Sequence, residues 1–181
     1  MTKFHNKKKV LLLTTSFPLH EGIAVGIHVL EKCRYLTYNG WDVKVIAPHD
    51  PKGKRKENIE GIQVLRFPYF WPFRFQKLAY GSGIPTNFRT SWLAKFQLPF
   101  FLLAFFFFAL RHALKADILH CHWSLAGLVG ILVGKLTKKK VVLMMHGAEV
   151  FVLGKHPLLK FVLKHCDYLI SNSTFTEGKT L

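Results

Sequence analysis

Three histidines stand at or near the ends of two apolar segments of this sequence. His120 and His122 fall two residues apart within residues 117–122, and His146 directly follows the apolar run of residues 141–145. Side chains two positions apart in a β-strand project from the same face, so His120 and His122 are predicted to lie together. Imidazoles grouped in this way could ligate a metal ion, or one of them could act on a ligand by itself.

The neighbouring residues favour the second possibility. No carboxylate stands at ligand spacing after His122, because Trp123 and Ser124 follow it. A hydrolytic metal site needs more ligands than scattered imidazoles, so we expect neither a metal ion nor another cofactor. His146 is the better candidate for a chemical role, since it stands where a buried strand ends and Gly147 beside it leaves room for a ligand. The alternative is that His146 caps a helix or packs in a loop.

A glycine-containing loop near the start of the chain provides a second candidate site. Apolar residues 10–13 predict a buried strand, Gly22 and Gly26 follow in a loop, and residues 29–36 show helical spacing. A helix N-terminus after such a loop presents free backbone N–H groups and the positive end of the helix dipole, which suit an anion. The spacing is G-x-x-x-G, which differs from the dinucleotide fingerprint G-x-G-x-x-G. The two glycines could equally shape a turn and let the helix pack on the sheet.

Alternating strands and helices are predicted to position these groups. Six strands are expected over residues 10–13, 41–48, 62–67, 117–122, 141–145 and 167–171. Further helices are expected over residues 98–110, 125–136 and 157–165, and a loop over residues 49–58. This alternation predicts an α/β fold, a Rossmann-like doubly wound parallel sheet with the strand order 3-2-1-4-5-6. Its ligand crevice would lie between the carboxyl ends of the first and fourth strands.

The chain is strongly basic, with 26 Lys and Arg against 10 Asp and Glu in 181 residues and a formal net charge of +16. Such a charge favours phosphates, acidic membrane surfaces or nucleic acid as partners. Lysine clusters at residues 7–9 and 138–140 precede predicted strands, so both are expected at the edge opposite the ligand crevice, solvated or facing a membrane. Three cysteines without a C-x-x-C pair favour a reducing, intracellular compartment.

An aromatic stretch without a regular period runs from residue 68 to residue 98. Its rings and interleaved basic residues could stack on sugars, rest on a membrane interface, bind single-stranded nucleic acid or cap the sheet edge. Residues 98–110 follow without a polar side chain, a run too short for a membrane span. They are predicted to form a helix buried on most sides, and a surface helix dipping into a bilayer is the alternative.

Five short motifs occur in a fixed order along the chain. They are Thr15-Ser16-Phe17-Pro18 with Glu21-Gly22 and His28-Val29, then Asn39-Gly40-Trp41-Asp42-Val43-Lys44-Val45, Asp117-Ile118-Leu119-His120-Cys121-His122-Trp123, His146-Gly147-Ala148-Glu149 and Ser171-Asn172-Ser173. In this order they resemble the N-terminal half of glycosyltransferase family 4, retaining enzymes of the GT-B fold. Residues 78–84 also look like a loop of members that build surface polysaccharides. By this resemblance residues 1–181 are the N-terminal, acceptor-side domain, and the C-terminal donor-binding domain is absent from this chain.

The resemblance implies transfer of a sugar from a nucleotide-diphosphate sugar donor to an acceptor hydroxyl. It gives the catalytic role to His146, near the reacting carbon of the donor sugar. It places contacts with the donor's diphosphate and sugar on Gly22 and Gly147. The family often has two adjacent glycines where this chain has Glu21-Gly22, and this departure bears on how closely a phosphate approaches there.

By the same resemblance, acceptor contacts would come from His122, Trp123 and Tyr80. The expected acceptor is a glycan or a lipid-linked glycan, and the basic charge with the phenylalanine-rich helix suggests a cytoplasmic protein at the inner face of an anionic membrane. No nucleic-acid-binding motif is recognisable, so no nucleic acid is expected as a partner. The alternatives are a non-catalytic sugar-phosphate or nucleotide binding domain and a basic nucleic-acid-binding module. Without a second domain the chain is expected to be inactive by itself.

Overall fold

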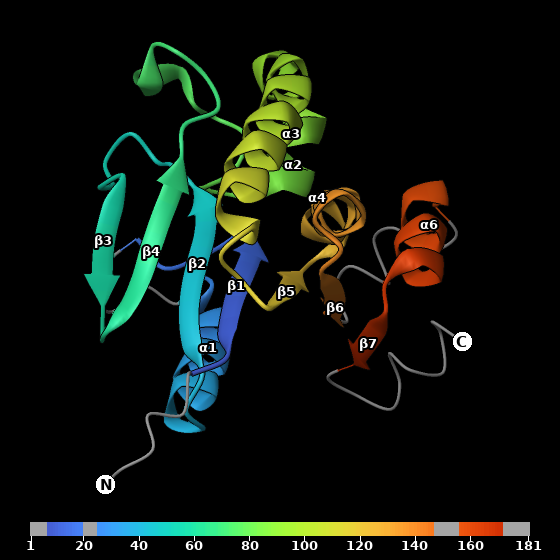
Figure 1. The fold of residues 1–181 in the computed structure, drawn as a ribbon. Coiled ribbons are helices and arrows are strands. Elements are labelled where there is room, and N and C mark those ends of the chain that lie inside the picture. Colours follow the sequence, from blue (N-terminus) through green and yellow to red (C-terminus); the bar gives the residue numbers. More distant parts are fainter. Residues whose placement is uncertain (1–6, 20–24, 147–155, 172–181) are drawn as a thin grey trace, which may run out of the picture.

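The computed structural model describes residues 7–19, 25–146 and 156–171. Within these ranges seven strands form one sheet in the order β3-β4-β2-β1-β5-β6-β7 (Figure 1). The strands are β1 (Lys9–Thr14), β2 (Asp42–Pro48), β3 (Lys56–Ile59), β4 (Ile62–Phe67), β5 (Ile118–His122), β6 (Lys140–Met145) and β7 (Tyr168–Ser171). The helices are α1 (Ile27–Tyr38), η1 (Phe73–Phe75), α2 (Ile84–Thr90), α3 (Trp92–Ala113), α4 (Ser124–Thr137) and α6 (Pro157–His165).

The parallel part of the sheet confirms the predicted topology. The six strands β4-β2-β1-β5-β6-β7 are parallel and stand in the predicted order 3-2-1-4-5-6. Each residue of the run Val10–Leu13 is buried, because β1 has neighbours on both edges and helices on both faces. The chain reverses its direction of strand addition between β1 and β5, and open α/β sheets commonly bind their ligands at the carboxyl ends of the strands at such a point.

Residues 56–59 correct the predicted loop over residues 49–58. They form β3, which pairs antiparallel with β4. Glu60 and Gly61 have φ values of 54° and 84°, as a two-residue type I′ hairpin requires, and Asn58 Oδ1 accepts the Gly61 N–H at 2.7 Å. An edge strand can be short and polar, and only Ile59 of β3 is buried, so no apolar alternation reveals the strand in the sequence.

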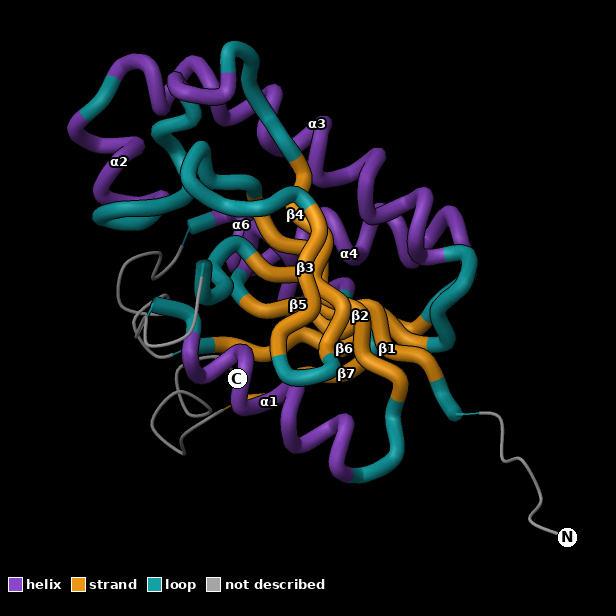
Figure 2. Tube along the Cα trace, turned by 90° about the vertical axis from the view of Figure 1, so that its left-hand side faces the viewer, coloured by secondary structure: helices purple, strands orange, loops and turns teal. Residues whose placement is uncertain are grey.

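Helices cover both faces of the sheet. Helix α1 lies on one face, and α3, α4 and α6 lie on the other (Figure 2). Alternate residues of β1 serve the two cores: Leu12 packs with Val29 of α1, whereas Leu11 and Leu13 belong to the core that includes Phe101 of α3. Residues His120 and His122 of β5 pair with Leu12 and Thr14 in register.

Glycine residues allow helix α4 to lie close to the sheet. A Cβ atom added to Gly130 would stand 2.2 Å from the Cys121 sulfur, and one added to Gly134 would stand 2.5 Å from Val141 Cγ2. Real Cβ atoms do not approach other heavy atoms so closely, so glycine at these positions sets the distance between α4 and the strands β5 and β6.

The aromatic stretch of residues 68–98 is more regular than predicted. It contains η1, α2 and the first turns of α3, which begins at Trp92 after Ser91 Oγ accepts the Ala94 N–H at 3.3 Å. Pro99 inside the helix obscures this start in the sequence. Only 28% of the most apolar 18-residue window of α3 is buried. The expectation of a helix buried on most sides is therefore wrong, because α3 buries one face and exposes the other.

Candidate functional site

The candidate site lies at the carboxyl edge of the sheet, where the topology predicts a crevice. His122 ends β5, and His146 follows the last residue of β6. The register pairs Thr14 of β1 with His122, so the end of β1 lies alongside. His28 adds a third imidazole from the first turn of α1. Three separate elements thus deliver nitrogen-bearing side chains to one edge of the sheet.

The rings of these residues form one connected cluster. His122 Nδ1 and His146 Nε2 are 3.2 Å apart, which allows one N–H to bridge the two rings. The Trp123 indole stacks on His146 with ring centroids 4.3 Å apart and planes 28° apart. His28 meets the same imidazole edge-on at 4.6 Å, and His120 lies 4.9 Å from His122. His146 therefore stands at the centre of the cluster.

The backbone of Trp123 is strained. This residue joins β5 to α4 with φ 77° and ψ 153°, a region that is almost confined to glycine. A non-glycine residue there costs about 1–3 kcal/mol and persists only where the surroundings enforce it. The Trp123 N–H donates to Met144 O at 3.3 Å, and its carbonyl accepts the Gly127 N–H at 2.9 Å. The strained junction holds the indole against His146, which is the kind of arrangement that functional sites retain.

Burial keeps the imidazoles of the cluster neutral. Desolvation lowers the pKa of His120 and of His146 to about 4, and it holds the pKa of His122 well below its usual value. Lys32 of α1 and the neighbouring imidazoles act in the same direction on His122. Neutral imidazole offers one N–H donor and one acceptor nitrogen. At neutral pH the cluster is therefore suited to hydrogen bonding and carries little charge.

Three buried polar atoms of the cluster have no hydrogen-bond partner in the part of the chain that the structure describes. They are His120 Nε2, His122 Nε2 and Trp123 Nε1. A buried polar atom without a hydrogen bond costs about 1–3 kcal/mol, so such atoms usually face a ligand or an ordered water. Within the described ranges, no group of three or more His, Cys, Asp or Glu side chains is arranged to hold a metal ion.

The lowered pKa values predict that acid weakens the fold. His120 binds a proton near pH 6.5 in the unfolded chain but only near pH 4 in the folded one, so the unfolded state binds more protons between these values. The free energy of unfolding should fall by up to about 2 kcal/mol from His120 alone as the pH drops from 7 to 5. Urea unfolding at both pH values measures this fall. In His120→Gln the fall should be smaller, and an equally steep fall in that variant would contradict the assignment.

Tyr80 lies in a different network from the histidines. Its hydroxyl donates to Pro48 O at 3.0 Å and accepts a hydrogen bond from Arg66 Nη1 at 2.7 Å. The Arg66 guanidinium is fully buried and also donates to Glu57 Oε1 at 2.6 Å and to Pro18 O at 2.5 Å. Burial raises the pKa of Tyr80, so the phenol stays protonated. These bonds tie the ends of β1, β2 and β4 together, and an acceptor contact from Tyr80 stays a prediction.

Two predicted site residues, Gly22 and Gly147, lie outside the described residues. The neighbouring Gly26 is described, and it precedes α1 with φ 79°. A Cβ atom there would stand 2.8 Å from Phe17 Cα, so this glycine allows α1 to pack against the end of β1. For Gly26 the structure supports the alternative of a turn that brings the helix onto the sheet.

His28 is the site residue that sequence reasoning missed. Its position near the start of a helix was visible in the sequence, and it belongs to one of the recognised motifs. Only the crossover from β1 through α1 brings its ring to 4.6 Å from His146, 118 positions along the chain by residue number. His122, Trp123 and His146, which were predicted separately as acceptor-binding and catalytic residues, do lie together.

Comparison with known proteins identifies the family and the fold. The sequence model of Glycosyltransferase Family 4 matches residues 25–179. The chain belongs to this family. Among solved structures, sucrose-phosphate synthase from Thermosynechococcus elongatus superposes with a TM-score of 0.68 at 18% identity, covering 95% of this chain and 44% of that one. A shorter piece of the same synthase gives a TM-score of 0.60 at 18% identity, covering 94% of this chain and 80% of that one.

MurG of Acinetobacter baumannii is also similar, with a TM-score of 0.50, 14% identity, and coverage of 91% of this chain and 41% of that one. This chain therefore spans less than half of the complete synthase and of MurG. Against curated protein sequences it finds no significant match. As a family 4 domain, the chain has the α/β architecture of the N-terminal half of a GT-B fold, and its histidine cluster lies at the carboxyl edge of that half.

Proposed function

We propose that this chain is the acceptor-side domain of a retaining glycosyltransferase that moves a sugar from a nucleotide-diphosphate sugar to an acceptor hydroxyl. The main supporting observation is the cluster of His122, Trp123 and His146 at the carboxyl ends of β5 and β6. Buried polar atoms of this cluster have no hydrogen-bond partner among the described residues. Family membership supplies the reaction class. A second domain, outside this chain, would hold most of the donor.

His146 is the proposed catalytic residue. Its ring is neutral because burial lowers its pKa to about 4. The Trp123 stack and the contact with His122 Nδ1 fix the orientation of the ring. A fixed N–H donor aimed at charge that develops in the transition state stabilises it far more than a mobile one does. We propose that this N–H group of His146 forms a hydrogen bond with the sugar of the nucleotide-diphosphate sugar, near its reacting carbon.

The donor's diphosphate would lie near the N-terminus of α1, with Gly22 and Gly147 as its proposed contacts. The first turn of α1 carries no acidic residue, so no carboxylate within that turn opposes the positive end of the helix dipole. Lys32 in the same helix adds positive charge close enough to act on His120 and His122. An anion is therefore favoured at this end of the site.

Acceptor hydroxyls suit the polar atoms that are left without partners. Trp123 Nε1 is a buried donor, His122 Nε2 is a buried donor or acceptor according to the tautomer, and a sugar hydroxyl can both donate and accept. We propose a glycan or lipid-linked glycan acceptor, as used in polysaccharide synthesis, and a cytoplasmic protein held peripherally at the membrane. We propose that Tyr80 contacts the sugar acceptor through its ring alone, because its hydroxyl already forms hydrogen bonds with Arg66 and Pro48.

A non-catalytic domain that binds a sugar phosphate or a nucleotide is the second candidate. It is favoured by the composition of the cluster, in which the described side chains are imidazoles and an indole and none is a carboxylate. Such a set can bind a ligand through hydrogen bonds without supplying an acid or a base at neutral pH.

Release of nucleoside diphosphate by the whole protein tests the proposal. Nucleotide-diphosphate sugars are offered one at a time, each with and without a membrane extract as the acceptor source. We expect acceptor-dependent release with one donor and none from the isolated 181-residue chain. Saturable binding of the sugar donor to the whole protein without any turnover would favour the non-catalytic candidate. Turnover by the isolated chain would contradict the proposal that a second domain holds most of the sugar donor.

A further inference from the structure

Helix α3 exposes a continuous apolar stripe on the side away from the sheet. We call it the outer stripe. Its members recur every three, four or seven positions and are each between 44% and 77% exposed; they are Trp92, Phe96, Phe100, Leu103, Phe107 and Leu114. No charged residue occurs between Lys95 and Arg111. A surface helix normally turns charged side chains outward, so this face is built for an apolar environment.

The opposite face of α3 belongs to the core. Phe101 and Phe105 are fully buried and pack on Phe67 of β4 with ring centroids 5.2 and 4.6 Å away. By length and composition α3 could span a bilayer. A span would have to leave this core, however, so the geometry favours a helix that lies in the plane of an interface.

The charged residues of the segment that contains α3 are all basic. No Asp or Glu occurs from Gly61 to Ala116, whereas this segment carries seven Lys and Arg residues. At the end of the outer stripe, Leu114 lines an open hollow of about 530 Å³ with Lys8, Lys115 and Lys139. Lys7 and Lys9 line the same hollow, as does Asp117, whose carboxylate accepts the Lys9 N–H at 2.7 Å. An apolar surface thus adjoins a basic one.

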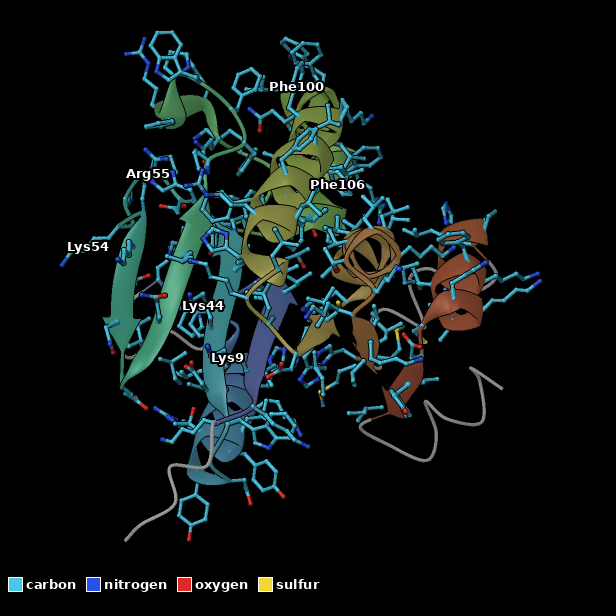
Figure 3. All side chains as sticks on the ribbon, viewed as in Figure 1. Lys9, Lys44, Lys54, Arg55, Phe100 and Phe106 are labelled. Carbon is cyan, nitrogen blue, oxygen red and sulfur yellow. The ribbon has the colours of Figure 1, made fainter. Side chains whose placement is uncertain are left out.

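The outer stripe also runs from the carboxyl ends of the strands to their amino ends. Helix α3 follows the carboxyl end of β4 through η1 and α2 and leads to the amino end of β5. Figure 3 shows Phe100 near the upper end of α3 and Lys9 and Lys44 low on β1 and β2. The stripe therefore begins at the carboxyl ends of the strands, where the histidine cluster also lies, and ends at the basic hollow near their amino ends.

We propose that the outer stripe and the lysine hollow dock this domain on a bilayer that contains anionic phospholipid. The exposed rings enter the interface, and the lysines meet the headgroup phosphates. Buried apolar area and attraction to anionic lipid together determine the binding of such helices. This inference rests on the membrane location proposed above and names the surface responsible. It depends on no step of sugar transfer.

Sedimentation of the whole protein with lipid vesicles tests the proposal without any donor. Vesicles of phosphatidylcholine alone are compared with vesicles that also contain phosphatidylglycerol, and we expect stronger binding to the second. In the variant Phe96→Gln/Phe100→Gln/Phe107→Gln the partition coefficient should fall by about tenfold or more on both. In Lys8→Gln/Lys115→Gln/Lys139→Gln it should fall by about a hundredfold at low salt, on anionic vesicles only.

Matched variants separate this surface from general effects of apolarity and charge. Tyr35→Gln/Tyr38→Gln removes exposed rings from α1, and Lys52→Gln/Lys54→Gln/Arg55→Gln removes three charges elsewhere; both should bind as the parent does. Unfolding midpoints equal to the parent's show that each variant folds. The proposal is overturned if the parent does not sediment, if the stripe variant binds normally, if a single-stranded oligonucleotide abolishes vesicle binding, or if light scattering shows a dimer that only the stripe variant loses. A protein that sediments but releases no nucleoside diphosphate with any nucleotide-diphosphate sugar and membrane extract would refute the proposed function alone.

Discussion

Replacing His146 by alanine in the whole enzyme should lower kcat by about a hundredfold to a thousandfold, with a much smaller change in the KM of the acceptor. The ring is neutral, nearly buried and held on two sides by Trp123 and His122, so its N–H is oriented before the donor arrives. Steady-state rates of nucleoside diphosphate release measure the effect.

A histidine outside the site provides the control. His165 is exposed at the end of helix α6, where its Nδ1 lies 2.8 Å from Phe161 O, and His165→Ala should leave kcat unchanged. His146→Asn, which retains an N–H donor, should recover part of the lost rate. If kcat of His146→Ala equals that of the parent, then the catalytic assignment is wrong, whatever happens to donor binding.

The second large effect concerns stability: Gly130→Ala should lower the free energy of unfolding by about 2 kcal/mol or more. Alanine is favoured over glycine inside a helix by about 1 kcal/mol, so helix propensity alone predicts the opposite sign. The new Cβ would stand 2.2 Å from the Cys121 sulfur, and α4 must move away from the sheet to accommodate it. Urea unfolding of the two proteins measures the difference.

Cys121→Ala should reverse most of this effect. Without the sulfur, the nearest atoms to the added Cβ are Val141 Cγ1 at 3.6 Å and Cys121 Cβ at 3.7 Å, which are ordinary contacts. In the double variant Gly130→Ala should therefore cost little relative to Cys121→Ala alone. Equal costs in the two backgrounds would show that the sulfur does not set the distance between α4 and the sheet.

The sequence predicts the parallel strands well because each carries several apolar residues within a short stretch that turn residues or a helix bound. A short run in which every residue is apolar, such as Val10–Leu13, fits a strand that is buried on both faces of a parallel sheet. The edge strand β3 and the start of α3 escape prediction for opposite reasons. The first, Lys56–Ile59, is too polar to show a period, and the second, from Trp92, is apolar on every side with a proline inside it.

The candidate site is predictable in part. The spacing of His120 and His122 places them together, and the end of a buried strand places His146 at the same edge. The approach of His28 depends on how α1 crosses the sheet, and a sequence does not encode that distance locally. The fixed hydroxyl of Tyr80 likewise depends on Arg66, a buried cation that looks like an ordinary strand residue in the sequence.

The unpaired nitrogens at the end of β5 also couple the fold to its ligand. In the unfolded chain, water solvates His120 Nε2, His122 Nε2 and Trp123 Nε1, whereas in the folded chain these atoms are buried and have no hydrogen-bond partner among the described residues. A sugar whose hydroxyls pair with them removes the deficit only in the folded state. Occupancy by such a ligand and thermal stability then rise together, so the shift in melting temperature measured with each sugar in turn tests the acceptor contacts proposed here.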